Sequence, residues 1–220
     1  MTSTFQLSIR RGPDQIASFR LPFRVGMSIL DGLRQISASD APDLVYRWEC
    51  GGQRICGVCT IRVNGQPALS CGVLVEPEGD YLIEPLDGFP VERDLVVALG
   101  ERLQAMQPYA PYLVEGGRPL ESRADAEASK HLRTCIECWA CVSVCPISLN
   151  TDSAHALSMV KLARFALDPR DGADRAGSAH EGGLDLYTAT CPSCRRCETV
   201  CPKDIDIFVD AIQVLEHADT

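Results

Sequence analysis

The sequence contains no stretch of about 18 uncharged apolar residues, the length that a transmembrane helix requires. Its N-terminal residues also lack the apolar core of a signal peptide. Basic residues are few: Lys and Arg total 21 against 30 Asp and Glu, which gives a net charge of −9. Such a chain has no basic excess to attract nucleic-acid phosphates or an anionic membrane. We therefore expect no nucleic-acid partner and no direct membrane span.

The short motifs of common enzyme sites are missing as well. The sequence has no P-loop, no G-x-G-x-x-G and no recognisable Ser-His-Asp set, so we expect no catalytic residue on this chain. Cysteine, in contrast, is abundant, with 12 residues in two separated groups. A chain of 220 residues is long enough for two small domains, and the grouping of the cysteines favours two.

Eight cysteines lie in two runs that each read C-x2-C-x2-C-x3-C-P. This is the spacing of bacterial ferredoxins, in which three thiolates of one run and the last of the other run hold each 4Fe-4S cluster. The first predicted 4Fe-4S site consists of Cys135, Cys138, Cys141 and Cys201, and the second of Cys145, Cys191, Cys194 and Cys197.

Zinc and disulfide bonds are the alternatives for these runs. Structural zinc usually takes four ligands as two C-x2-C pairs, whereas these runs contain four cysteines each. A cysteine content of about 5% also falls short of a disulfide-stapled secreted scaffold. Both observations favour iron-sulfur clusters in a reducing compartment, and we expect a cytoplasmic protein.

The other four cysteines read C-x5-C-x2-C-x11-C, close to the plant-type 2Fe-2S pattern C-x4-C-x2-C with a distant fourth cysteine. The first gap has one residue too many. Gly51 and Gly52 lie in that gap and allow positive φ angles, so the backbone can bulge around a cluster. Four buried structural thiols are the alternative. We predict a 2Fe-2S cluster held by Cys50, Cys56, Cys59 and Cys71.

Local patterns predict the elements of the first half. Alternating apolar and polar residues at 5–10 and 16–21 predict a hairpin. Ser28 is suited to cap a short amphipathic helix, and residues 60–63 are typical of a strand. Apolar residues recur near the helical period from 91 to 106, which predicts a helix there.

In the second half, a Pro- and Gly-rich stretch at residues 109–121 indicates a crossing between domains. The expected elements are helices at 122–133, 151–167 and 204–217, with a surface loop at 171–183. The whole pattern predicts an α+β protein.

The order of these motifs resembles the iron-sulfur subunit of succinate dehydrogenase and fumarate reductase. The 2Fe-2S pattern is followed by PLDGFPVERDLVV at residues 85–97, by PYL at 111–113 and then by the two ferredoxin runs. The resemblance implies a β-grasp 2Fe-2S ferredoxin domain at residues 1–105. It also implies an α-helical ferredoxin domain with two 4Fe-4S clusters at 106–220.

The same resemblance implies partners. In that family the clusters relay electrons between a flavoprotein subunit, which carries FAD and interconverts succinate and fumarate, and a quinone or another redox partner. We therefore expect an FAD-containing subunit and a membrane-anchor or other electron-donor or acceptor subunit as partners. The chain would then be peripheral on the cytoplasmic face of the membrane, without a substrate site of its own.

Two departures from the family pattern leave alternatives open. Cys194 stands where the common family form lacks a cysteine and holds a 3Fe-4S cluster, so a 4Fe-4S cluster is expected instead. Residues 147–150 and Pro192 stand where many relatives carry the Trp and His of a quinone pocket. One alternative is a related flavoprotein complex that acts on a different substrate with a low-potential, non-quinone donor. Another is a stand-alone ferredoxin or redox sensor.

Four further residues near the runs are expected to have ordinary structural roles. His131 is not needed as a ligand because each site already has four cysteines. Trp139, between two cysteines, is expected to shield a cluster. Arg195 and Arg196 are expected to be an exposed, solvated pair, and the alternatives are that they raise the potential of the third cluster or dock an acidic partner.

Overall fold

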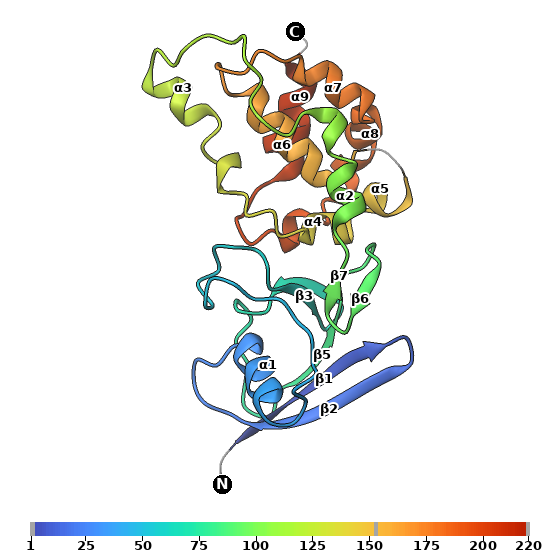
Figure 1. Cartoon of the computed structure of the whole chain (residues 1–220). Helices are drawn as coiled ribbons and strands as arrows, with labels where there is room; N and C mark the ends of the chain where they lie inside the picture. The colour runs from blue at the N-terminus through green and yellow to red at the C-terminus, as the bar shows by residue number, and fades with distance from the viewer. Residues whose placement is uncertain (1–2, 152–153, 219–220) are drawn as a thin grey trace. The chain divides into compact units, whose positions relative to one another are not determined.

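The computed structural model describes residues 3–151 and 154–218, which form two compact units (Figure 1). One unit is rich in strands and comprises the chain up to Ala98 together with Ile136–Ala140. The other is helical and comprises Leu99–Cys135 and the chain from Cys141 onward. A strand-rich unit followed by a helical one confirms the predicted α+β class.

A five-stranded mixed sheet forms the strand-rich unit, in the order β2-β1-β5-β3-β4. Strands β1 and β5 are parallel, whereas the other neighbouring pairs are antiparallel. The predicted hairpin is present, with Phe5 opposite Leu21. The strands are β1 (Thr4–Gly12), β2 (Gln15–Pro22), β3 (Thr60–Val63), β4 (Gln66–Leu69) and β5 (Asp80–Glu84).

Helix α1 (Ile29–Ala38) begins where the sequence predicts. Ser28 Oγ accepts the Asp31 amide at 3.2 Å, and the Ser28 amide donates to the Asp31 carboxylate at 2.9 Å, which forms a capping box. The helix buries its apolar face in one core with alternate residues of β1. This core includes Phe5, Leu7, Ile9, Ile29, Leu33 and Ile36.

The helix predicted from residue 91 to 106 is wrong for most of its length. The structure has a hairpin of β6 (Val91–Arg93) and β7 (Val96–Val97), followed by a short α2 (Gly100–Gln104) with no buried residue. Val91 is 53% exposed, so the spacing of apolar residues here does not mark a single buried face. β-Branched valines favour extended backbone, and that preference outweighs the approximate period.

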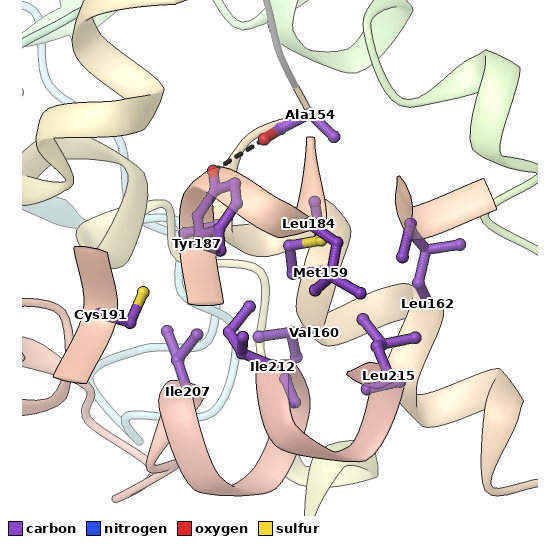
Figure 2. Packing of buried hydrophobic residues seen from close by; sticks show 14 of the residues in the cluster. Ala154, Met159, Val160, Leu162, Leu184, Tyr187, Cys191, Ile207, Ile212 and Leu215 are labelled. Atoms are coloured by element: carbon purple, nitrogen blue, oxygen red, sulfur yellow. Dashed lines mark hydrogen bonds between the residues drawn. The ribbon is translucent and has the colours of Figure 1, made fainter. Parts of the chain in front are cut away.

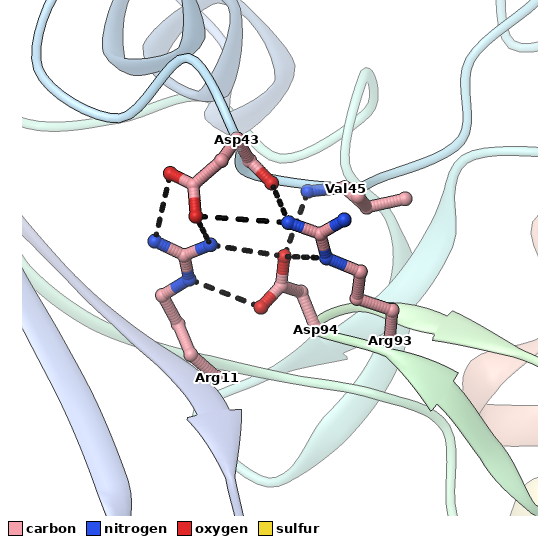
Figure 3. Close-up of polar contacts among 5 residues, drawn as sticks. All are labelled: Arg11, Asp43, Val45, Arg93 and Asp94. Carbon is pink, nitrogen blue, oxygen red and sulfur yellow. Dashed lines mark hydrogen bonds and ion pairs between the residues drawn. The ribbon is translucent and has the colours of Figure 1, made fainter.

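A polar network ties this hairpin to β1 and to the segment that leads to Cys50 (Figure 3). The carboxylate of Asp94 accepts Arg11 Nε at 3.0 Å and the Val45 amide at 2.9 Å. Arg11 also donates to Asp43 at 2.8 Å, and Arg93 donates to the Asp43 carbonyl at 2.9 Å. The network therefore fixes residues 43–45, just before the loop that carries the first cysteines.

Four helical segments enclose the core of the helical unit (Figure 2). Their innermost side chains are fully buried and include Met159, Leu162, Tyr187, Ile212 and Leu215. The segments are α6 (Ala156–Ala166), α8 (Leu184–Cys194), the π-helical η4 (Ile207–Ile212) and α9 (Gln213–His217).

The loop predicted at 171–183 is wrong, because this stretch contains helix α7 (Arg175–Glu181). Asp174 accepts the Gly177 amide at 2.8 Å and caps the helix. Arg175 is buried and forms an ion pair with Asp171 at 2.6 Å, in which both side chains are 2% exposed. The Gly- and Ala-rich composition indicated a loop, but a cap and a buried ion pair order the segment.

Other helix boundaries also differ from the sequence pattern. The helix expected at 122–133 is α3 (Arg123–Ala128) and a separate 3-10 turn, η2 (Leu132–Thr134). The helix expected at 151–167 is α6 alone, and residues 152–153 lie outside the described residues. The last helix begins at Ile207 because Asp206 accepts the Val209 amide as an N-cap.

The remaining short elements are α4 (Ala140–Val144), α5 (Pro146–Asn150), η1 (Gln107–Tyr109) and η3 (Glu198–Val200). None of the helices in the described part of the chain has the length and apolar character that crossing a bilayer requires.

Candidate iron-sulfur centres

The β3–β4 hairpin brings together two cysteines of the strand-rich unit. Cys59 immediately precedes β3 and Cys71 lies two residues after the end of β4, and the Ser70 amide donates to the Cys59 carbonyl at 3.0 Å. The two Sγ atoms are 3.3 Å apart, and both residues are buried. A local turn thus places two thiols side by side, so that both can bind the same cluster.

A cradle of backbone amides surrounds the sulfur of Cys50. The Ile55 amide is the strongest of these donors, followed by the Cys56 side chain and by the amides of Gln53 and Gly52. Together they lower the pKa of Cys50 to about 6, because donors stabilise the thiolate. Amide groups that point at sulfur are what an anionic iron-sulfur cluster needs.

Left-handed residues fit the extra residue into this loop. Gly51, Gly52, Arg54 and Gly57 have φ angles of 70°, 97°, 58° and 71°. The loop therefore curls around the Cys50 sulfur instead of extending away from it. The five-residue gap between Cys50 and Cys56 is therefore compatible with both cysteines binding one 2Fe-2S cluster.

The sulfur of Cys71 lies near the sulfurs of both Cys59 and Cys50. Burial, together with the Cys59 thiol and the nearby Cys50, raises the pKa of Cys71 to about 11. Both thiols act on Cys71 as neighbouring charges, which means that the three sulfurs share one small region. The four predicted ligands of the 2Fe-2S cluster thus converge, with amide donors, and fit that group.

The second 4Fe-4S set lies in the helical unit. A pocket that is partly open to solvent is lined by all four of its cysteines. Burial, together with Cys145 and Cys194 as neighbouring charges, raises the pKa of Cys191 to about 12. Burial likewise raises the pKa of Cys197. Four thiols around one hollow fit a cubane cluster.

The helices explain how these four residues meet. Cys191 and Cys194 lie in the last turn of α8, where a spacing of three places them on one face. Cys197 directly precedes η3, and Cys145 caps α5, whose first residue is Pro146. Proline is favoured at this first helical position because it lacks an amide hydrogen.

The first 4Fe-4S set is divided between the two units. Cys135, Cys141 and Cys201 pack against the core of the helical unit, and Cys201 Sγ accepts the Ile205 amide at 3.4 Å. Cys138 belongs to the strand-rich unit, where it packs against the buried group that contains Cys59 and Cys71.

Gly57 makes the contact between the 2Fe-2S loop and the segment that carries Cys138. A Cβ atom at Gly57 would lie 2.5 Å from the Ile136 carbonyl oxygen and 3.0 Å from Cys138 Cα. Only a glycine allows the two backbones to approach so closely. Within the strand-rich unit, the loop of one predicted cluster therefore touches a predicted ligand of another.

Trp139 and His131 make contacts with other side chains. Trp139 is 6% exposed and contacts Phe89 edge to face, with ring centroids 5.9 Å apart. His131 Nε2 lies 3.2 Å from the Asp210 carboxylate. Among residues 3–151 and 154–218, no three His, Cys, Asp or Glu side chains are arranged to hold a single metal ion.

Tyr187 is a residue that the sequence pattern did not single out. Its side chain is fully buried, and its hydroxyl donates to the Ala154 carbonyl at 2.7 Å (Figure 2). Burial raises the pKa of Tyr187, and Cys145, Cys191 and Cys141 raise it further as neighbouring charges. The signal in the sequence was the i, i+4 spacing from Tyr187 to Cys191, which places both on one face of α8.

Comparisons with known proteins assign each part of the chain to a domain family. Residues 6–104 match the family of 2Fe-2S iron-sulfur cluster binding domains, and residues 131–205 match the 4Fe-4S dicluster domain family. The fumarate reductase iron-sulfur subunit of Haemophilus influenzae is 31% identical over 211 residues, which cover 87% of this chain and 81% of that protein.

A subunit of the CoM/CoB fumarate reductase of Methanothermobacter marburgensis is 35% identical over 204 residues, or 91% of this chain. This chain spans only 40% of the length of that relative, and 43% of an iron-sulfur protein of Methanococcus maripaludis.

Among solved structures, a chain of the Mycobacterium smegmatis Sdh1 complex in the apo form superposes with a TM-score of 0.83 and 26% identity. The match covers 99% of this chain and 95% of that one. The fold, the domain matches and the similarity over most of the Haemophilus influenzae subunit agree, and this chain belongs to the family of iron-sulfur subunits of fumarate reductase and succinate dehydrogenase.

Proposed function

We propose that this chain is an electron-transfer subunit that relays electrons between an FAD-containing subunit and a quinone or another redox partner. The contact at Gly57 carries the proposal, because it places the loop of one predicted cluster against a ligand of the next. The proposed 2Fe-2S ligands are Cys50, Cys56, Cys59 and Cys71. The proposed 4Fe-4S ligands are Cys135, Cys138, Cys141 and Cys201 in one set, and Cys145, Cys191, Cys194 and Cys197 in the other.

The bound clusters would supply one-electron redox chemistry without proton transfer or bond formation. The task of the protein is then to hold, separate and insulate them. Thiolates bind the iron, and the amide donors around Cys50 stabilise negative charge. The apolar core that includes Cys145, Cys191 and Tyr187 would shield one side of the second 4Fe-4S site from water. No residue of the chain is assigned a role in substrate chemistry.

The test is Cys56→Ser in the purified native complex. We expect loss of the 2Fe-2S EPR signal, retention of the cubane signals and survival of flavin-centred activity with an artificial dye. Val58→Ser changes a 39% exposed neighbour in the same loop and should leave all signals intact. An unchanged 2Fe-2S signal in the Cys56 variant would refute the assignment.

A second candidate is a related complex that acts on a different substrate with a low-potential, non-quinone donor. Two observations favour it: Cys194 lines the second 4Fe-4S pocket, and Pro192 lies inside α8 where relatives carry a quinone-pocket His. Assays of the native complex with succinate and with other alkene acids, and with quinone and low-potential dyes, separate the candidates. In either case, we propose that the chain is peripheral on the cytoplasmic face of the membrane through its partners.

A further inference from the structure

Arg195 occupies an unusual backbone position beside the second 4Fe-4S pocket. It follows Cys194 and ends α8 with a φ angle of 50°, in the left-handed region that non-glycine residues rarely adopt. Arg195 also lines the pocket together with the four cysteines. The turn therefore holds a cationic side chain next to the thiols.

Three side chains keep the guanidinium in place. Nε lies 2.6 Å from a carboxylate oxygen of Glu198, and a terminal nitrogen lies 2.5 Å from Asp206. The guanidinium also stacks over the ring of Phe208 at 5.1 Å. With 35% of its side chain exposed, Arg195 is not the freely solvated residue that the sequence suggested.

The charge of Arg195 acts on the ligands of the pocket. It interacts electrostatically with Cys191 and with Cys197, on opposite sides of it in the sequence. A guanidinium is protonated at any physiological pH, so this positive charge is constant. A fixed cation near a cluster favours the reduced state, which carries one more negative charge.

We infer that Arg195 raises the reduction potential of the second 4Fe-4S cluster and thereby favours transfer of the electron from the first cubane to the second. The inference rests on the proposed function, since it requires a cluster at Cys145, Cys191, Cys194 and Cys197. One electron leaves the first cubane and enters the second, and no proton or bond moves. Glu198 and Asp206 hold the guanidinium in place and offset part of its charge.

The experiment is a potentiometric titration of the cluster-loaded protein, followed by EPR at pH 8 to keep both carboxylates ionised. In Arg195→Gln the cation is lost and two carboxylates remain beside the cluster. We expect the equilibrium for reduction of the second cubane to fall about tenfold, a drop of about 59 mV for one electron. The 2Fe-2S potential should stay unchanged.

Three variants separate charge from packing. Arg195→Lys keeps the charge and should retain most of the potential. Glu198→Gln removes a negative charge and should raise the potential. The double variant Arg195→Gln/Glu198→Gln should return the potential toward the wild-type value. As a matched control, Arg164→Gln changes another arginine that stacks on an aromatic ring, Phe165 at 5.3 Å, and should leave the second cubane unaffected.

Each outcome has one meaning. An unchanged potential in Arg195→Gln, or an equal drop in Arg195→Lys, would overturn the inference. If Arg195→Gln fails to retain the cluster, the Glu198→Gln variant provides the test. A potential of the second cubane that does not rise in Glu198→Gln would then overturn the inference. A wild-type protein without a second cubane signal would instead overturn the proposed function.

Discussion

Asp94 is the residue on which the polar network before Cys50 depends (Figure 3). Its side chain is 4% exposed, and it accepts hydrogen bonds from both Arg11 and the Val45 amide. Nothing in the local sequence predicts this arrangement, because the partners are separated by 83 and 49 positions. Such a contact exists only when the fold brings distant segments together.

We expect Asp94→Ala to destabilise the strand-rich unit by about 2 kcal/mol, because the part-buried Val45 amide loses its acceptor and the largely buried Arg11 guanidinium loses one of its two carboxylate partners. For a unit of about 100 residues, this lowers the melting temperature by on the order of 10 °C. The measurement is the thermal loss of the visible absorption of the 2Fe-2S cluster.

Two further variants serve as controls for this prediction. Asp94→Asn keeps an acceptor for Val45 and should melt between the wild type and the alanine variant. Asp43→Ala removes a 62% exposed partner of Arg11 and should have little effect, because exposed ion pairs contribute little. Equal decreases in melting temperature for Asp43→Ala and Asp94→Ala would show that the burial of Asp94 does not determine its contribution to stability.

At the scale of elements, the loop that contains Gly57 connects the 2Fe-2S site to the segment of Cys138. In Gly57→Ala the added Cβ would meet the Ile136 carbonyl oxygen at 2.5 Å, on a backbone with a φ angle of 71°. We expect the two segments to be forced apart and the magnetic interaction between the 2Fe-2S cluster and the neighbouring cubane to weaken. EPR of the fully reduced protein measures this interaction.

Gly65→Ala provides the matched control. Gly65 has a φ angle of 80°, but no atom lies within 4 Å of an added Cβ. Both substitutions incur the cost of a left-handed conformation, about 1 kcal/mol, and only the Gly57 variant also meets a steric clash. If the two variants weaken the magnetic interaction equally, backbone strain rather than close approach explains the effect.

Elements with a strong local signal could be predicted from the sequence. The β1–β2 hairpin surrounds a Gly-Pro-Asp turn, and α1 begins at a Ser28–Asp31 capping box, so both depend on neighbouring residues. The prediction from 91 to 106 was wrong because a β-hairpin can carry a similar spacing of apolar residues. Helix α7 was missed because its order depends on the buried Arg175–Asp171 ion pair.

For the candidate sites, the sequence predicted the grouping of the cysteines but not the residues around them. Cysteine spacing fixed the grouping of ligands, because thiolates must converge on one cluster whatever surrounds them. The surroundings were not predictable: Tyr187 and the Arg195–Asp206 pair depend on the packing of α8 and η4. Sequence therefore predicts the ligands, whereas the side chains that pack around them can be found only in the fold.

At the scale of the whole molecule, the two cysteine runs depend on each other. The last cysteine of each run is assigned to the site formed by the other run, so neither 4Fe-4S site is complete within one stretch of chain. Cys145 from the first run indeed lines the pocket of Cys191, Cys194 and Cys197. Both runs must fold before the second site can form.

Cys194 is the residue on which the expected type of cluster in this second site depends. Cys194→Ala removes one of the four proposed ligands, so we expect a 3Fe-4S cluster in place of the proposed cubane and a fall from about ten iron atoms per chain to about nine. An oxidised 3Fe-4S cluster has an unpaired electron, whereas an oxidised 4Fe-4S cluster of this type does not. The variant should therefore gain an EPR signal in the oxidised state.

The same variant tests the direction in which electrons can flow. Reduction potential depends on cluster type and charge, and we expect the 3Fe-4S form to have the higher potential. With the proposed flavoprotein partner, electrons would then collect at the end of the chain, whereas the proposed wild-type cubane would favour delivery from a low-potential donor. Ser193→Ala, an exposed neighbour, should change neither iron content nor potential. About nine irons in the wild-type protein would mean that Cys194 is not a ligand, and the argument for a low-potential terminus would fail.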